Sequence, residues 1–363
     1  MDIQKLIVDA LTKGHSPLAV FRALEIDPAE VAPDVDNEDD LWKVLVQIAN
    51  HYEKNPPAFV QKQYISNISK VVELISNSSK IVVIIGAGAS VGPDFRSPGG
   101  LYDTIAKAGV LSDPYQVFDL DYFRHDPSIF WRFAHTIFPS TNPEHSAAQY
   151  FFAELEKRGK LLRLYSQNVD TLEVGIPDEK LRCVHGSWRE TRCLQCGELH
   201  TIEDLRESVN NQTVPVCKKC GGQVKPGIVF FKQPVSIKEE EIRSDSHNAD
   251  LLIVVGTSLR VAPVSYLPEV FYRVPSILIN REPVTCQFNA ELLGDCDAVV
   301  GVLENALGWK QTTDGGTLDD FVFTRPNKFV LRTKEGEHLR FFETARTTFN
   351  VTPSIPDSDN FIF

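Results

Sequence analysis

The apolar positions of the first 50 residues recur at the spacing of α-helices. A first helix is predicted because one set of residues falls on a single face, namely Ile3, Leu6, Ile7, Ala10 and Leu11. Ser16-Pro17 is typical of the start of a second helix, and a third is predicted around residues 41–48. We expect an acidic loop from Asp27 to Asp40 and a linker at residues 54–57. The pattern thus predicts a separate helical segment over residues 1–55.

From about residue 65 onward, short apolar runs alternate with helical stretches. A helix predicted at residues 68–75 leads into the run Ile81–Ile85, and similar runs follow at residues 161–165, 251–255, 276–279 and 298–300. Runs this short and this rich in β-branched residues are typical of parallel strands buried on both faces. We therefore predict an α/β fold over residues 65–310, a doubly wound parallel sheet of the Rossmann-like kind. Its ligand should lie at the carboxyl ends of the strands.

Two segments differ from this pattern. Residues 186–228 are polar and carry paired cysteines, which predicts a small inserted module. The C-terminal tail, residues 311–363, begins with a linker at residues 312–316. A β-hairpin is predicted at about residues 321–333, because two short apolar runs flank Arg325-Pro326-Asn327-Lys328.

Charge and composition narrow the classes of function. The 363 residues carry a net charge of −12, which disfavours a dedicated nucleic-acid binder and suits a basic, lysine-rich partner. No apolar run reaches the roughly 18–20 residues of a membrane helix, and the first residues lack the features of a signal peptide. We expect an intracellular protein with no membrane partner, whose seven cysteines are reduced thiols or metal ligands.

The clearest chemical signal is a pair of CxxC motifs, Cys193-x2-Cys196 and Cys217-x2-Cys220, with twenty residues between them. This spacing is typical of a zinc ribbon. Four thiolates fill a tetrahedral coordination sphere and leave no position for water, so the predicted zinc is structural. The alternative is unligated or disulfide-bonded cysteine, which the spacing and the expected reducing compartment disfavour.

Polar residues follow the apolar runs, where the ends of parallel strands meet in one crevice. In chain order these four sets are Gly86-Ala87-Gly88, Gln167-Asn168 with Asp170, Gly256-Thr257-Ser258 and Asn280-Arg281-Glu282. Asp94-Phe95-Arg96 lies beside the first set, and His185 lies just before the inserted module. The glycines after the first run permit close approach to a pyrophosphate, although Val91 stands where GxGxxG has its third glycine. Alone, His185 would more often be structural than a base; the convergence of the sets favours a functional site.

Taken together, the segments GAGAS, PDFRSPGGLY, SQNVDTLE, HGS, the two CxxC pairs, KPGIVFF, GTSL and LINREP resemble the sirtuin family in order and spacing over about residues 67–307. The chain is most similar to the nuclear, class I branch, in which an N-terminal helical bundle and a C-terminal strand pair modulate the core. The resemblance implies an NAD-binding Rossmann-like lobe, a small inserted zinc-ribbon and helical lobe, and an N-terminal regulatory segment.

The implied activity is NAD-dependent deacetylation or deacylation of protein lysine side chains, producing nicotinamide and O-acyl-ADP-ribose. The resemblance also implies NAD and one structural zinc, acyl-lysine substrates such as histones, and no sequence-specific nucleic acid. A role in transcription regulation and a nuclear or nucleocytoplasmic location would accompany this activity, although the sequence has no clear import signal.

Residue roles follow from the same motifs. His185 matches the general base, and Asn168 and Asp170 match residues at the nicotinamide ribose and its pocket. The residues that match NAD contacts are Gly86, Ala87, Gly88, Asp94, Phe95, Arg96, Gln167, Asn168, Asp170, Gly256, Thr257, Ser258, Asn280, Arg281, Glu282 and Cys296. Those that match the substrate-binding strands are Val229, Phe230 and Val261, and the zinc ligands are Cys193, Cys196, Cys217 and Cys220.

The chain also departs from the family. Two residues, Val91-Gly92, stand before Pro93 where the family usually has five, and residues 171–175 are about two residues short. Gly227 replaces an acidic or polar residue, and Lys232-Gln233 replaces Gly-Glu. The short cofactor loop supports an alternative interpretation, a regulator that binds NAD or ADP-ribose without turnover. A third, a zinc-ribbon adaptor for nucleic acids, is disfavoured because phosphate contacts need Lys and Arg.

Overall fold

The computed structural model of the chain describes residues 3–12, 14–23, 35, 37–54, 62–91, 95, 99–235, 237–261, 263–309 and 316–332. They divide into two units, residues 1–61 and residues 62–363, and we describe each by itself. Two candidate cofactor residues, Asp94 and Arg96, lie outside the described residues, as do most of both predicted linkers.

The first unit contains helices α1 (Ile3–Thr12), α2 (Pro17–Ala23) and α4 (Glu38–Lys54). They share a small core around Phe21 and Leu45, both fully buried. All three predicted helices are confirmed, but the loop expected to reach Asp40 is too long. Asn37 accepts a hydrogen bond from the backbone N–H of Asp40 at 2.9 Å and so caps α4, which places the acidic residues 38–40 in the first turn. Carboxylates stabilise that end of a helix.

The second unit is built on a sheet whose eight strands are β1 (Ile81–Ile85), β2 (Leu161–Ser166), β3 (Leu181–Cys183), β6 (Leu251–Val255), β7 (Ser276–Asn280), β8 (Ala290–Leu293), β9 (Phe321–Thr324) and β10 (Lys328–Leu331). Their order is β3-β2-β1-β6-β7-β8-β10-β9, and every neighbouring pair is parallel except β9 and β10. The predicted doubly wound parallel sheet is confirmed. The strand order reverses between β1 and β6, and ligands bind at such switch points.

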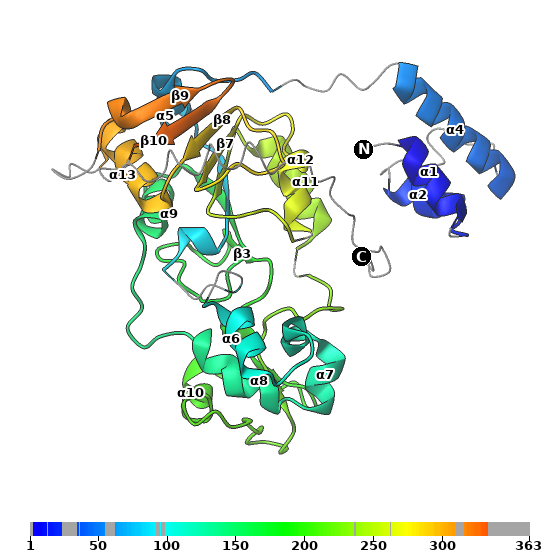
Figure 1. Cartoon of the computed structure of the whole chain (residues 1–363), viewed down its shortest axis with the longest axis vertical. Coiled ribbons are helices and arrows are strands. Elements are labelled where there is room, and N and C mark those ends of the chain that lie inside the picture. The colour runs from blue at the N-terminus through cyan, green and yellow to red at the C-terminus, as the bar shows by residue number, and fades with distance from the viewer. Residues whose placement is uncertain are drawn as a thin grey trace. The chain divides into compact units, whose positions relative to one another are not determined.

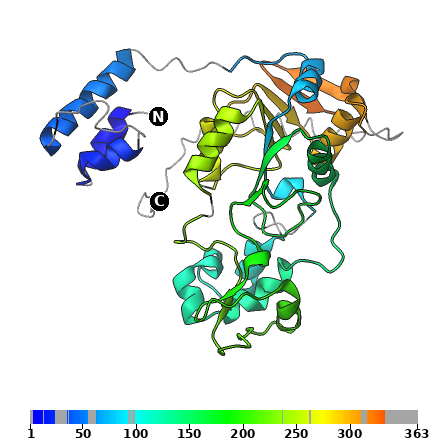
Figure 2. The ribbon, with the colours of Figure 1, turned by 180° about the vertical axis from the view of Figure 1, so that it is seen from behind.

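Helices cover both faces of the sheet, which explains why β1 and β6 are buried at every position. One face packs against α5 (Ile68–Asn77), α9 (Ala147–Lys157) and α13 (Cys296–Ala306), and the other against α11 (Glu239–Asn248) and α12 (Leu267–Val270). Figures 1 and 2 show this layer from two sides. We call this body the sheet lobe; it also includes the short 3-10 helices η1 (Ala87–Ala89), η5 (Val264–Tyr266) and η6 (Leu318–Asp320).

One strand prediction was wrong. Residues 298–300 belong to α13, and the strand that precedes it is β8. Asp295 caps the helix by accepting hydrogen bonds from the backbone N–H groups of Asp297 and Ala298. The buried residues of α13 include Cys296, Val299, Val300 and Leu303, a helical spacing that an apolar run of three residues does not reveal.

The predicted C-terminal hairpin is confirmed as β9 and β10. It does more than flank the core, because β10 pairs in parallel with β8 and extends the sheet. Phe329, Val330 and Leu331 are buried there, and the Asn327 side chain donates a hydrogen bond to the Phe288 carbonyl at 2.7 Å. The hairpin is therefore part of the sheet lobe.

A second hydrophobic core lies outside the sheet. Its residues come from 101–137 and 188–230, together with Val169, and we call the body formed by these two ranges the small lobe. Its elements are α6 (Leu101–Ala108), η2 (Pro114–Phe118), α7 (Leu120–His125), α8 (Ser128–Phe133), η3 (Ala134–Thr136), η4 (Trp188–Glu190), β4 (Arg192–Cys193), α10 (Ile202–Asn210) and β5 (Val224–Lys225). Figure 1 shows α6, α7, α8 and α10 grouped away from the sheet. The described helices include none with the length and apolar composition that a bilayer span requires.

Candidate functional site

The turns after β1 and β6 lock together at the switch point. The backbone N–H of Gly86 donates to the Val255 carbonyl at 3.0 Å, and that of Gly88 donates to the Gly256 carbonyl at 2.8 Å. Gly256 has φ +61°, and a Cβ on it would overlap Ala89 N and the carbonyl carbon of Gly88. These glycines therefore let two turns meet backbone to backbone. Ala87 and Gly88 are exposed on the outer side, so a ligand can approach there.

Side chains that follow β2 join these turns. The Asn168 amide donates to the Gly86 carbonyl at 3.2 Å, and the Gln167 amide donates to the Thr257 hydroxyl at 2.9 Å. Asp170 accepts a hydrogen bond from the Ser90 hydroxyl at 2.8 Å. The structure thus brings together the polar residues that follow β1, β2 and β6. Burial of the Asp170 carboxyl raises its pKa, while the Ser90 hydroxyl partly offsets that effect.

His185 is held from two directions. Its Nδ1 lies 2.9 Å from the Gln167 carbonyl oxygen, which can only accept, so Nδ1 carries the proton and Nε2 holds the lone pair of the neutral ring. Its own backbone carbonyl accepts a hydrogen bond from Val229 N–H at 2.7 Å. His185 therefore connects the strand-end loops of the sheet lobe to the segment around Val229 in the small lobe.

The remaining candidate NAD residues, Asn280 to Glu282 and Cys296, lie near the end of β7, the strand that pairs with β6. The Asn280 amide donates to the Glu282 carbonyl at 2.8 Å, and Arg281 forms an ion pair with Asp295 at 3.0 Å. Cys296 is buried at the start of α13, near the end of β7. These groups connect to the switch point because the Gly256 N–H donates to the carbonyl of Ile279, the residue before Asn280. Ser258, beside Thr257, is exposed.

The candidate substrate residues occupy different environments. The Phe230 ring is fully buried, with edge contacts to Phe118 and Phe123 at centroid distances of 5.4 and 5.3 Å. Phe95 joins the same aromatic cluster, 6.0 Å from Phe118. Val229 is half-buried beside His185, and Val261 is half-buried on the loop after β6. Phe230 therefore anchors this segment in the small-lobe core, and its neighbour Val229 is the more accessible of the two.

At Gly227 and Lys232, where the chain differs from the family, the structure allows little space around the segment that carries Val229 and Phe230. A Cβ on Gly227 would lie 2.6 Å from the Ser187 carbonyl oxygen and 2.7 Å from Glu190 Cβ, so an acidic side chain does not fit. Lys232 has φ +70°, a left-handed conformation that favours the glycine it replaces. Its ammonium forms ion pairs with Asp119 at 3.0 Å and Asp121 at 3.2 Å.

Several residues with strained backbone conformations lie in the loops that carry the candidate site residues. Four described non-glycine residues have a left-handed φ, and besides Lys232 they include Thr171, directly after Asp170, and Leu259, directly after Ser258. For bulky or β-branched residues this conformation is unfavourable and is concentrated at functional sites. Three of the four are thus in segments that carry candidate residues.

Glu173 is a buried carboxyl that the sequence reasoning did not single out. It is 9% exposed, and neither of its oxygens has a hydrogen-bond partner within range among the described residues. Burial raises its pKa, with partial relief from the nearby Ser166 hydroxyl and a further increase from the Asp170 charge. The only sequence signal was its position three residues after Asp170, beside the apolar Leu172.

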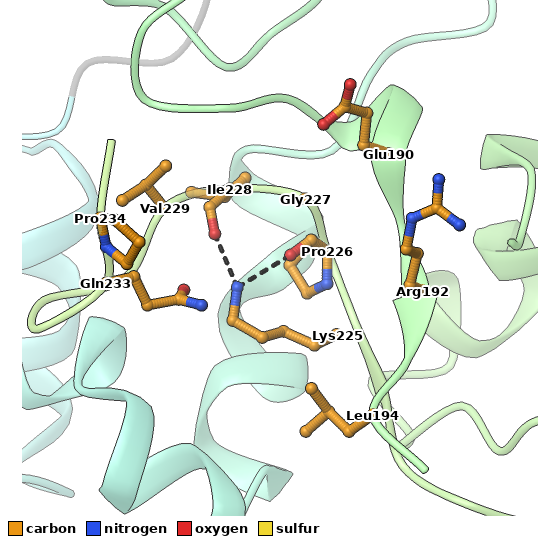
Figure 3. A pocket seen from close by; sticks show the side chains of 10 residues that line it. All are labelled: Glu190, Arg192, Leu194, Lys225, Pro226, Gly227, Ile228, Val229, Gln233 and Pro234. Carbon is orange, nitrogen blue, oxygen red and sulfur yellow. Dashed lines mark hydrogen bonds between the residues drawn. The ribbon is translucent and has the colours of Figure 1, made fainter. Parts of the chain in front are cut away.

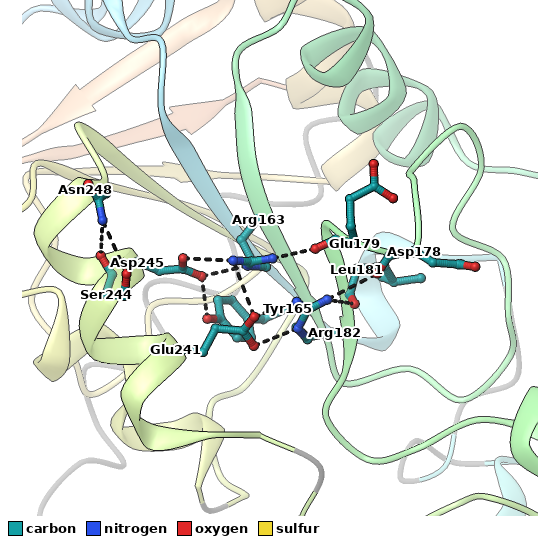
Figure 4. A network of polar contacts seen from close by, with 10 residues as sticks. All are labelled: Arg163, Tyr165, Asp178, Glu179, Leu181, Arg182, Glu241, Ser244, Asp245 and Asn248. Atoms are coloured by element: carbon teal, nitrogen blue, oxygen red, sulfur yellow. Dashed lines mark hydrogen bonds and ion pairs between the residues drawn. The ribbon is translucent and has the colours of Figure 1, made fainter.

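A partly buried polar network joins the strands that lead into the site to α11 (Figure 4). Arg163 and Tyr165 of β2 both donate to Asp245 of α11, at 2.8 and 2.7 Å. On β3, Arg182 donates to Glu241 of the same helix at 2.7 Å. Because β2 and β3 lead into Gln167 and His185, this network fixes the strands that carry the candidate catalytic residues.

The four paired cysteines converge in the small lobe. Their sulfur atoms all lie within 4.8 Å of one another, with Cys193 and Cys220 3.5 Å apart and Cys196 and Cys217 3.7 Å apart. Sulfurs around a tetrahedral zinc with Zn–S bonds of about 2.3 Å are about 3.8 Å apart. No disulfide joins these pairs, because both distances are well above the roughly 2.05 Å of an S–S bond. The cluster fits a structural zinc.

Backbone groups favour the thiolate form that a metal requires at two of the four cysteines, Cys193 and Cys217. At Cys220 the Gly222 N–H also lowers the pKa, but hydrogen bonds with the thiols of Cys196 and Cys193 outweigh it and raise the pKa to about 12. The N–H of Cys196 is the largest cause that lowers the pKa of Cys193 to about 7, against the effect of burial. For Cys217, burial opposes ionisation, but backbone N–H groups and the His200 imidazole lower the pKa overall. The buried His200 was missed by sequence analysis because it lies outside both CxxC pairs.

Comparison with known proteins gives a consistent family. A model of the Sir2 family matches residues 86–263. NAD-dependent protein deacetylase sirtuin-1 of Mus musculus is 37% identical over 307 residues, 81% of this chain and 41% of that protein. NAD-dependent deacetylase sir2D of Dictyostelium discoideum is 38% identical over 322 residues, 79% of this chain and 59% of that protein.

The fold comparison agrees. A solved structure described as "Structural Basis for the Mechanism and Regulation of Sir2 Enzymes" has a TM-score of 0.58 and 28% identity, covering 67% of this chain and 98% of its own. The chain spans about half the length of the curated relatives it matches. The motif match, the sequence identity and the shared fold together show that the chain belongs to the Sir2, or sirtuin, family and is class I-like.

Proposed function

We propose that this chain is an NAD-dependent protein-lysine deacetylase or deacylase, which yields nicotinamide and O-acyl-ADP-ribose. The observation that carries the proposal is the position of His185, which is bonded to Gln167 on the side of the glycine turns and to Val229 on the side of the small lobe. A base in that position can reach a nucleotide and a peptide at the same time. The named relatives support the same activity.

The residues of the switch point fit NAD. Two glycine turns present an exposed outer surface, and the polar side chains of Gln167 and Asn168 are fixed beside it. Bound there, NAD would supply a ribose carbon that becomes electrophilic as nicotinamide leaves. In this proposal Asn168 and Asp170 hold the ribose and the nicotinamide pocket, while the groups around Asn280 and Cys296 hold the adenosine end.

His185 acts as the general base. The Gln167 carbonyl holds the proton on Nδ1, so Nε2 can accept a proton from a ribose hydroxyl. An imidazole suits this step because its ordinary pKa lies near neutral pH. The acyl-lysine peptide would lie along the segment at Val229 and gain main-chain hydrogen bonds as an added strand, with Val261 on the opposite loop.

The four cysteines would hold one zinc ion with a structural role. Because thiolates occupy all four positions of a tetrahedral site, no open position remains for a substrate. We further propose histones among the substrates, a role in transcription regulation and a nuclear or nucleocytoplasmic location. The support is that a relative from Candida albicans, 34% identical over 300 residues, is named an NAD-dependent histone deacetylase.

The test is nicotinamide release from NAD in the presence of acetyl-lysine histone peptides. We expect peptide-dependent release from the wild-type protein and a loss of at least a hundredfold in His185→Ala, since general-base catalysis contributes about 10²–10⁴-fold. His247→Ala is the matched control, because His247 is exposed on α11. If the wild-type protein released no more nicotinamide than His185→Ala, the proposed deacylase activity would be refuted. Tight ADP-ribose binding by calorimetry without release would support the non-catalytic regulator instead.

A further inference from the structure

We propose that Lys225 is a positioning residue for the acyl-lysine substrate, because its ammonium closes the turn that holds Val229 beside His185. This inference rests on the function proposed above. Lys225 ends β5 in the small lobe and is only 6% exposed. Neither of the two hydrogen bonds of its side chain reaches a residue assigned to NAD.

The side chain folds back on the segment that follows it (Figure 3). Its Nζ donates to the Ile228 carbonyl at 2.7 Å and to the Pro226 carbonyl at 3.0 Å. The same nitrogen lies 3.9 Å from the centre of the Phe230 ring. Two carbonyl oxygens and one aromatic face accommodate the three N–H groups of an ammonium, so the group ties three residues of one turn together.

No carboxylate bonds to this ammonium among the described contacts. A cavity of about 260 Å³ opens beside it, and its charged lining residues besides Lys225 are Glu190 and Arg192. Burial lowers the pKa of Lys225 to about 7. A buried cation without an ionic partner is costly, and such groups are seldom retained for stability alone. The contacts of Lys225 with Pro226, Ile228 and Phe230 therefore point to a role in function rather than in stability alone.

The turn controls how the candidate substrate segment meets the catalytic histidine. Val229, between two residues that Lys225 holds, donates its N–H to the His185 carbonyl at 2.7 Å. Phe231 N–H then donates to the Phe118 carbonyl at 2.8 Å. Losing the ammonium would remove its contacts with Ile228 and Phe230. The turn would then be held by these backbone bonds, by the Gln233 side chain that accepts from Phe230 N–H at 2.9 Å, and by the packing of the Phe230 ring. The fraction of molecules with a competent segment would fall, and the apparent peptide affinity would fall by the same factor.

Lys225→Met tests the proposal because methionine keeps the length and the apolar stem but removes the ammonium. We expect the Kd and KM for an acetyl-lysine peptide to rise about tenfold, while kcat and the Kd for ADP-ribose change less than twofold. Lys62→Met is the matched control. Lys62 is also a partly buried lysine whose Nζ donates to a carbonyl, that of Val274, but it lies at the opposite end of the sheet, next to the start of β7.

The outcomes separate the two proposals. A wild-type protein that neither binds peptide nor releases nicotinamide would overturn the proposed function and this inference with it. An active wild type with an unchanged peptide Kd in folded, zinc-containing Lys225→Met would overturn the inference alone, as would an equal loss in Lys62→Met. If Lys225→Met does not fold, Lys225→Arg decides. The adjacent cavity leaves room for a guanidinium, so we expect a peptide Kd within threefold of wild type, and a tenfold loss in the folded variant would refute the role.

Discussion

Replacing Gly256 by alanine should damage the switch point more than any other single methyl group we can add there. The residue has φ +61°, where an alanine is about 1 kcal/mol less stable than glycine. The new Cβ would also overlap Ala89 N and the Gly88 carbonyl carbon and lie 2.9 Å from Gly88 Cα. These are backbone atoms, which cannot rotate away as the end of a side chain can.

The magnitude follows from adding the two effects. Overpacking a well-filled core costs about 1–3 kcal/mol, so the total loss in Gly256→Ala is about 2–4 kcal/mol. Domains are stable by only about 5–15 kcal/mol, so this is a large part of the total. The chain offers a matched control in Gly301→Ala. Gly301 lies within α13, a Cβ there meets nothing within 4 Å, and alanine should gain about 0.5–1 kcal/mol in a helix.

Calorimetric unfolding of both variants measures the difference. The second unit of the chain should melt several degrees lower in Gly256→Ala, at about 2–4 °C per kcal/mol, and slightly higher in Gly301→Ala. ADP-ribose affinity should fall in Gly256→Ala alone, because the turn after β1 must shift to admit the methyl group. A Gly256→Ala protein with wild-type stability and affinity would show that the two turns do not lock as we describe, and equal losses in both variants would show that any added methyl group is harmful.

Three further changes probe other parts of the molecule. Cys217→Ser should lose the zinc and unfold the small lobe, because metal binding is coupled to folding, whereas Cys286→Ser should keep one zinc per chain by elemental analysis. Glu173→Gln should equal wild type in stability near pH 4.5 and exceed it at pH 8, since a carboxyl whose pKa is raised on folding loses stability as pH rises through that pKa; urea unfolding that shows no gain at pH 8 would contradict this. Lys232→Ala and Lys232→Gly both lose the two ion pairs, but only alanine keeps the left-handed strain, so denaturant unfolding should find Lys232→Ala about 1 kcal/mol less stable than Lys232→Gly.

Much of the sheet lobe could be predicted because its strands are buried on both faces. A strand covered twice must be apolar throughout, as Ile81–Ile85 and Leu251–Val255 are, and few other structures need such a run. Strand β8 was not predicted because it contains the charged residue Glu291. In the structure this charge is balanced by an ion pair at 3.2 Å with Lys328, which lies opposite it on the neighbouring strand β10. Long-range partners of this kind leave no local signal.

The candidate site was predictable for a different reason. Residues that follow parallel strands must meet at one edge, so the convergence of Gln167, Asn168 and Thr257 follows from topology. The role of Gly256 could not be predicted from topology, because its tight contact with Gly88 joins two turns that are 168 residues apart in the sequence. His200 and Lys225 were missed for the same reason: what distinguishes them is burial beside particular atoms, which spacing along the chain does not encode.

The hairpin of β9 and β10 has a practical consequence for anyone who shortens this protein. If the chain ended at Trp309, β8 would become the border of the sheet, with unpaired backbone groups and Leu292 newly uncovered. Such a border recruits strands from other molecules, so a shortened protein should self-associate and precipitate as its concentration rises. Glu291 would at the same time lose Lys328, its ionic partner. The hairpin therefore protects the edge of the sheet. Assays on a shortened protein would measure the effect of losing this protection as well as the activity.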